Sequence, residues 1–381
     1  MAKHGFATVP LAMLVPAGTV SAQELEIVNI RVGQGDSTLI QGPLKADGSR
    51  VNVLFDGGDV AAYDGGKVIG AVLSKHGVKA LDYLIVSHYD VDHIGGIVSG
   101  SHHGASFLLG WNGTPGEVGD DDHDGHDGWI GTPNFEPDND EIGHGDDIPV
   151  AHFIDRGDAP APASQAYQKY RLLAESMGDR FSLSDQTSVD GFEIDLGDGA
   201  KMTALAGNGF VRGRANRVPK VTTKNERSLS FLVSYKQFDY LISGDMIGRQ
   251  YGSEDARVES AVGEAIEDMG VIVDVLHVDH HGGNNGSDSD FLEKIRPTIA
   301  VISAGNDNDY HHPHSQTLSR LEQAKVYRII QTSWGATDDV SYAVRRVQAI
   351  YQGDVVVTSD GEAYTVSTSR TFKVDKNPRR P

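Results

Sequence analysis

Four side chains that can bind a metal ion lie within six residues, in the segment His88-Tyr89-Asp90-Val91-Asp92-His93. The apolar run at 84–86 before it and the pair Gly95-Gly96 after it predict a buried strand that leads into a tight loop. Side chains at the carboxyl end of such a strand project into the crevice where α/β sheets bind ligands. A polar surface loop is the alternative, but two imidazoles and two carboxylates buried together without metal would leave uncompensated charge. The segment is therefore interpreted as part of a metal site.

Two further apolar runs end in residues of the same chemistry. The run at 238–243 leads into Gly244-Asp245, and the run at 271–278 leads into Asp279-His280-His281-Gly282-Gly283. One Asp or one His pair would be weak support, because a lone buried histidine is more often a core residue than a ligand. Three strands that each end in metal-binding side chains predict one shared site.

A layered fold is needed to bring these strand ends together. Strands are expected at 25–32, 38–41, 51–55, 83–87, 228–235, 240–243, 271–278 and 298–303, with a hairpin formed by 354–358 and 363–366. Helices are expected at 68–75, 160–177, 255–268, 288–295 and 315–324. Mixed elements on this scale, in a chain of 381 residues, indicate an α/β fold with layered sheets and helices outside.

The composition limits both the ligands and the partners of such a site. The chain has no cysteine, so metal ligands must come from His, Asp and Glu. Its formal net charge of −21 repels nucleic acid and anionic membranes at long range. A polyanionic substrate would therefore have to be held by a local basic patch or by a metal ion.

One stretch of the acidic chain is basic. It runs from Arg212 to Lys220 and continues to Lys224 and Arg227, directly before the strand that leads to Asp245. By chain proximity this stretch could overhang the metal site and bind phosphate. A solvated loop is the equal alternative, and the sequence does not decide between them.

The remaining segments define the domain limits. Residues 1–22 predict a secretory signal, because Lys3 and His4 precede an apolar run that ends in Val20-Ser21-Ala22. The mature chain is then expected to be secreted or periplasmic, with no membrane span, in one domain at 23–370 and a tail at 371–381. A Gly-, Asp- and His-rich insertion at about 110–148 is interpreted as a solvated acidic loop, with calcium binding as the alternative.

In order and spacing these motifs resemble those of the metallo-β-lactamase superfamily, and most closely the hydrolase domain of ComEC DNA-uptake proteins and bacterial phosphorylcholine esterases. The resemblance covers almost all of the mature chain. It rests on the segments 32–37, 55–58, 88–93, 225–229, 243–245, 280–282 and 311–314. It implies a four-layer αββα sandwich of two mixed sheets with helices outside, and a site for two divalent metal ions.

The resemblance also implies roles for individual residues. One metal ion would be held by Asp92, His93, Asp245 and one of His280 and His281, and His281 is favoured because it directly precedes glycine. Asp245 would bridge to the second ion, held by His88 and Asp90. The other expected site residues are Asp56, which supports the motif loop, Asp36, Asn225, Ser228 and Arg227 near the site, and His312 or His314 facing the substrate or its leaving group. Asp92 could also orient the nucleophile.

The chain departs from the commonest superfamily motif at Asp90, where most members have histidine. This anionic ligand shifts the preference from zinc towards manganese, magnesium or iron, although zinc remains an alternative. A further ligand downstream of the motif is not identifiable among His102, His103, His123, His126, His144 and His152. Occupancy of the second metal position is therefore left open.

The expected reaction is hydrolysis of a phosphodiester by a metal-activated water, on nucleic acid or a phosphorylated surface polymer or lipid. No obligatory protein partner is evident. One alternative is lactone, thioester or β-lactam hydrolysis, which predicts an apolar pocket and a full set of histidine ligands. The other is a non-catalytic binding protein, in which protein groups fill every metal coordination position.

Overall fold

The computed structural model describes residues 24–59, 65–98, 148, 150–176, 179–248, 258–306, 308–336, 348–350, 353–368 and 371–374. The expected signal at 1–22 and nearly all of the acidic insertion lie outside the described residues, so both stay predictions. Within the described ranges, no helix has the length and apolar character needed to cross a membrane.

The first sheet has the strand order β18-β17-β16-β1-β2-β3-β4-β5-β6. Its strands are β1 (Leu25–Asn29), β2 (Thr38–Gln41), β3 (Asn52–Phe55), β4 (Leu81–Ile85), β5 (Val150–Asp155), β6 (Arg180–Ser182), β16 (Val355–Ser359), β17 (Tyr364–Ser367) and β18 (Thr371–Val374). Pairing is antiparallel from β18 to β3 and parallel from β3 to β6. The carboxyl ends of β3 and β4 therefore meet at one edge, where Asp56 and the 88–93 motif follow.

The second sheet has the order β15-β14-β13-β12-β11-β10-β8-β7, with β9 paired to β8. Its strands are β7 (Glu193–Gly197), β8 (Ala200–Gly207), β9 (Phe210–Val211), β10 (Ser230–Tyr235), β11 (Phe238–Ser243), β12 (Val275–His277), β13 (Ile299–Ile302), β14 (Arg328–Gln331) and β15 (Gln348–Ile350). Strands β11 to β15 are parallel. The residues after β11 and β12, including Asp245 and His281, therefore share an edge.

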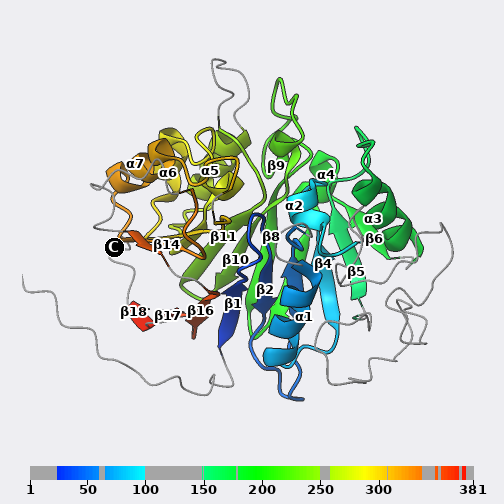
Figure 1. The fold of residues 1–381 in the computed structure, drawn as a ribbon, viewed down its shortest axis with the longest axis horizontal. Helices are drawn as coiled ribbons and strands as arrows, with labels where there is room; N and C mark the ends of the chain where they lie inside the picture. Colours follow the sequence, from blue (N-terminus) through cyan, green and yellow to red (C-terminus); the bar gives the residue numbers. More distant parts are fainter. Residues whose placement is uncertain are drawn as a thin grey trace, which may run out of the picture.

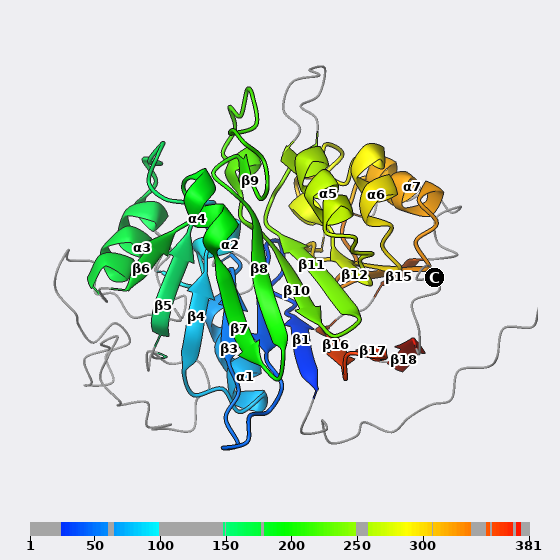
Figure 2. The ribbon, with the colours of Figure 1, turned by 180° about the vertical axis from the view of Figure 1, so that it is seen from behind.

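Helices cover the outer faces of the two sheets (Figures 1 and 2). They are α1 (Gly65–Lys75), α2 (Val91–Ile94), α3 (Gln165–Ser176), α4 (Gln186–Gly191), α5 (Val258–Asp268), α6 (Ser289–Ile295) and α7 (Ser315–Gln323), with 3-10 turns η1 (Asn225–Arg227) and η2 (Asp279–Gly282). Apolar side chains of α1 and α3 pack on the first sheet, and those of α5, α6 and α7 pack on the second. The expected four-layer αββα arrangement is confirmed.

The central core lies between the sheets and joins them. Phe55 of the first sheet meets Phe231 of the second edge to face, with ring centroids 6.3 Å apart. The buried hydroxyl of Tyr240 donates a hydrogen bond of 2.6 Å to Asn29 Oδ1 across the same interface. This packing fixes the two ligand-bearing edges relative to each other, since close-packed interiors do not deform continuously.

Several element boundaries differ from the expected ones, among them that of the strand expected at 25–32, which ends at Asn29. The run at 271–278 forms a strand only at Val275–His277, and before it the backbone N–H of Val273 donates to Ile295 O at the end of α6. The tail expected from residue 371 begins with β18, which pairs with β17. Strand β18 pairs with β17 through its backbone, and this pairing does not require apolar side chains. The basic composition of the tail therefore did not predict a strand.

Candidate metal centre

The 88–93 motif is held in place by backbone contacts with neighbouring loops. His93 O accepts from Gly57 N at 2.6 Å, and Asp92 O accepts from Asp36 N at 3.2 Å. Gly35, with φ of +131°, packs so closely against this loop that a Cβ there would lie 2.2 Å from Asp92 O. The glycine of the opening loop is therefore required by a close backbone approach.

The second sheet contributes Asp245 and His281 from the ends of β11 and β12. Gly244 lets the two sheets approach, because a Cβ at this position would lie 2.2 Å from Ser87 Oγ. In η2, His280 and His281 adopt left-handed φ values of 53° and 52°. This unusual backbone turns His281 into the space between the sheets, where its side chain is buried.

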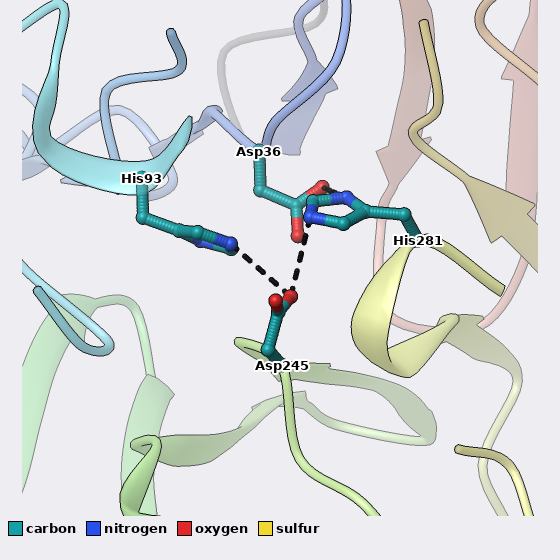
Figure 3. Close-up of side chains that lie close together, drawn as sticks. All are labelled: Asp36, His93, Asp245 and His281. Carbon is teal, nitrogen blue, oxygen red and sulfur yellow. Dashed lines mark ion pairs between the residues drawn. The ribbon is translucent and has the colours of Figure 1, made fainter. Parts of the chain in front are cut away.

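Four of these side chains converge on one point (Figure 3). Ligand atoms of Asp36, His93, Asp245 and His281 all lie within 4.8 Å of one another. Asp245 Oδ1 is 3.1 Å from His93 Nε2 and 3.3 Å from His281 Nε2. Asp92 Oδ2 lies 3.4 Å from the same nitrogen of His281. Carboxylates and imidazoles from both sheets thus surround a space of metal-ion size.

Each buried imidazole is oriented through its other ring nitrogen. Nδ1 of His93 lies 2.8 Å from Asp56 Oδ2, Nδ1 of His281 lies 3.0 Å from Ser303 O, and Nδ1 of His88 lies 3.1 Å from Ser87 Oγ. The three Nε2 atoms are buried and have no hydrogen-bond partner within the described part of the chain. Nitrogens that face inward, backed by fixed outer contacts, are the arrangement of metal-binding histidines, so the site fits a divalent ion.

A second group of ligand atoms lies beside the first. Nε2 of His88 is 3.6 Å from Asp90 Oδ2 and 3.8 Å from Asp245 Oδ2. The Lys224 ammonium forms an ion pair with Asp90 Oδ2. Burial opposes ionisation of Asp90, but His88 and Lys224 outweigh it and hold the pKa of this carboxyl below its ordinary value. Asp245 therefore lies between the two groups.

Three expected site residues surround these groups. His280 lies 3.6 Å from Asp245 Oδ2, but its Nε2 is 3.2 Å from Asn225 Nδ2 and its Nδ1 is 2.8 Å from Asn285 Oδ1. With both ring nitrogens engaged, His280 is less suited to bind metal than His281. Asn225 also places Nδ2 3.5 Å from Asp245 Oδ2, and the Ser228 hydroxyl is buried beside Gly244.

Asp36 is more central than its sequence position indicated. Its Oδ1 lies 3.4 Å from His281 Nδ1 and 3.4 Å from His277 Nε2, a buried histidine at the end of β12. Burial opposes ionisation, but His281 and His277 lower the pKa of Asp36. His277 was not expected at the site, and its position within an apolar strand gave the only signal. Asp36 can orient His281 through the Nδ1 atom of that ring, or it can bind the metal ion itself.

His312 and His314 lie on the same side of the site as η2. The His312 ring is 5.2 Å from that of His280 and 5.4 Å from that of His314. Burial, together with the charges of His281 and His280, lowers the pKa of His312 to about 3, so this ring is neutral near pH 7. Exposed Tyr310 stacks on its outer face, with centroids 5.8 Å apart.

The basic stretch is held mostly by the protein itself. Arg212 donates to the carbonyls of Val189 and Ala204, and Arg214 lies 2.9 Å from Asp268. Further contacts include those of Arg217 with Asn208 O and of Arg227 with Asn208 Oδ1 and Val221 O. Arg227 therefore anchors the loop, and its expected role near the site stays a prediction. Lys224 is the residue of the stretch that reaches the ligand cluster.

A further histidine ligand was expected after the 88–93 motif, and for five of its six candidates this role stays a prediction. His102, His103, His123, His126 and His144 lie outside the described residues. The sixth, His152 on β5, is 41% exposed, lies 2.6 Å from Asp179 and stacks on Tyr83. It does not join the cluster.

Metal affinity is expected to increase with pH. Burial lowers the pKa of His93, but Asp245, Asp56 and Asp92 outweigh it and raise that pKa well above its ordinary value. The pKa of His281 is raised in the same way, with Asp36 and Asp245 outweighing burial. Metal must then displace protons from both rings at a pH where a free histidine is already neutral. Calorimetric titrations in buffers of different ionisation enthalpy should show proton release, and affinity should rise through the raised pKa values.

The stability of the metal-free protein changes with pH in the opposite direction to the metal affinity. A raised histidine pKa stabilises the fold below the unfolded-state value of about 6.5, and this contribution is lost as pH rises through the folded-state pKa. For the loading prediction, a metal affinity that does not change between about pH 6 and 9 would contradict the ligand roles of His93 and His281.

Comparison with known proteins supports the resemblance seen in the motifs. The chain is 24% identical over 338 residues to ComE operon protein 3 of Bacillus subtilis, which covers 85% of this chain and 34% of that protein. It is 38% identical over 53 residues to Recombination protein 2 of Haemophilus influenzae, covering 14% of this chain and 7% of that one. The chain thus spans about a third of the length of the first relative. No family model matches.

The comparison with solved structures found a putative metal-dependent hydrolase from Parabacteroides distasonis, with 12% identity and a TM-score of 0.35 over 80% of this chain and 92% of that chain. A diphosphatase of the PhnP family has 11% identity and a TM-score of 0.35, over 88% of this chain and 98% of that chain. The similarity to ComE operon protein 3 agrees with the resemblance that the motifs indicated.

Proposed function

We propose that this protein, which resembles metallo-β-lactamase-type proteins in its motifs and layered fold, is a metal-dependent hydrolase that cleaves phosphodiesters. The observation that carries the proposal is the convergence of three inward-facing imidazole Nε2 atoms on Asp245, with Asp90 and Lys224 alongside. A divalent ion held there would lower the pKa of a water nucleophile and stabilise charge on the phosphoryl oxygens. Its identity is left to experiment.

The protein groups have separable tasks in this reaction. The partly exposed Asp92 carboxylate can accept a proton from the attacking water and orient it towards phosphorus. The amide of Asn225 and the ammonium of Lys224 can donate to anionic phosphoryl oxygens, since both lie at the ligand cluster. Neutral His312 can contact the leaving group as a hydrogen-bond partner rather than as a charged acid.

Two features favour a phosphodiester over a β-lactam or lactone. Asp90 adds a negative ligand, which suits the oxygen-preferring metals that bind phosphates. Lys224 adds a cation within reach of the same ligands, and it can pair with an anionic phosphoryl oxygen. The substrate is proposed to be nucleic acid or a phosphorylated surface polymer or lipid. In this strongly acidic protein, the metal ion and Lys224 would provide the local attraction that such a polyanion needs.

The test is a metal-reconstitution assay. Chelator-treated protein is loaded with manganese, zinc or magnesium and offered bis-nitrophenyl phosphate, single-stranded DNA and nitrocefin. Cleavage of a phosphodiester with at least one metal, and none after chelation, is the expected result. Opening of nitrocefin alone would replace the proposal with a lactamase-type activity. Tight metal binding without turnover of any of the three would favour a binding protein.

A further inference from the structure

The two halves of the ligand cluster differ in how their negative charge is balanced. In the first half, His93 and His281 face Asp245 Oδ1 and Asp92, and Asp36 lies behind His281. In the second half, the described ligand atoms are His88 Nε2, Asp90 Oδ2 and the shared Asp245 Oδ2. Among the residues that the structure describes, the second half thus offers one imidazole where the first offers two.

A lysine side chain enters the second half. Lys224 immediately precedes η1, and its Nζ forms an ion pair with the same Asp90 oxygen that lies 3.6 Å from His88 Nε2. Its side chain is 62% exposed, so the ammonium reaches inward from solvent on a flexible four-carbon stem. The nearby Arg156, by contrast, is fixed over the Tyr89 ring at 4.5 Å and donates to the carbonyls of Gly157 and Pro160.

We infer that the Lys224 ammonium balances the charge of Asp90 in the second half of the ligand cluster. It thereby competes with a second metal ion for this carboxylate. An ammonium and a divalent ion that share one carboxylate oxygen repel each other strongly in a partly buried site. The resting protein therefore holds one ion tightly, at His93, His281, Asp92 and Asp245. A second ion binds when Lys224 leaves Asp90, as it would on pairing with a phosphoryl oxygen of the substrate.

This inference rests on the metal centre of the proposed function but not on its substrate. If phosphodiester cleavage were disproved, the competition between Lys224 and the second ion would still stand or fall by metal binding alone. If neither ion bound tightly, both proposals would fail together.

The experiment measures metal stoichiometry in the full chain, for wild type and Lys224→Met, which keeps the aliphatic stem and removes the charge. After removal of loosely bound manganese, wild type should retain about one equivalent and the variant about two. The dissociation constant of the second ion should fall at least about ten-fold in the variant. The manganese resonance spectrum should change from that of a single ion to that of a coupled pair.

Two further variants make the result specific. Lys224→Arg retains the positive charge and should behave like wild type, whereas Lys220→Met removes an exposed charge four residues away and should leave the stoichiometry unchanged. The inference is overturned if wild type already holds two ions with similar affinity. It is also overturned if Lys224→Met leaves the second dissociation constant unchanged, or if Lys224→Arg gains the second ion.

Discussion

Replacing Asp245 with alanine is expected to remove both metal binding and hydrolysis. Asp245 is the one carboxylate that lies within 4 Å of His88, His93, His280 and His281, among the residues that the structure describes. Without it, the imidazoles of the two sheets lose the carboxylate that lies between them. We expect kcat/KM to fall at least about 10³-fold, equivalent to about 4 kcal/mol of transition-state stabilisation. Elemental analysis and steady-state kinetics on the best phosphodiester measure the two effects.

The control for this variant is Glu267→Ala, which removes an exposed carboxylate from α5, away from the ligand cluster. It should leave both metal content and rate unchanged. Asp245→Ala protein that is folded, retains full metal content and turns over at the wild-type rate would show that the ligand assignment is wrong.

Substitution of Asp56 is expected to have the second large effect, on stability as well as metal affinity. Its fully buried carboxylate accepts from Ser87 N at 2.7 Å and Ser87 Oγ at 2.6 Å, and it lies 2.8 Å from His93 Nδ1. Asp56→Ala would leave these donors buried without partners and place alanine at a φ of 58°. The free energy of unfolding should fall by about 3–5 kcal/mol, measured by denaturant unfolding of the metal-free protein.

Asp56→Asn separates the two effects. Asparagine tolerates left-handed backbone and keeps an oxygen for Ser87, so most of the stability should remain. It offers one oxygen and one amide group, and so cannot accept from every donor that the carboxylate satisfies. His93 then loses the partner that fixes its tautomer, and metal affinity should fall about 10–100-fold. Wild-type affinity in this variant, measured by competition with a chelator, would mean that Asp56 does not orient His93.

Much of the fold could be predicted from local patterns. Apolar runs bounded by Gly and polar residues identified β2, β3, β4, β10, β11 and β13, and helical spacing identified α1, α3, α5, α6 and α7. Strands β5 to β9, β14, β15 and β18 were not predicted. Exposed charged residues alternate with apolar ones in β7, and β6, β9 and β15 have only three, two and three residues. Sheet order likewise depends on long-range pairing, which no local pattern contains.

The 88–93 motif shows the same difference between what local patterns and what long-range contacts determine. By itself the sequence determined that His88, Asp90, Asp92 and His93 follow a buried strand, because backbone periodicity and turn residues act over a few positions. Only the tertiary structure placed Asp36 against His277 and His281, engaged both nitrogens of His280, and paired Lys224 with Asp90. The contacts of Asp36 and of Lys224 join residues from different sheets, so they follow from strand order and close packing rather than from spacing along the chain.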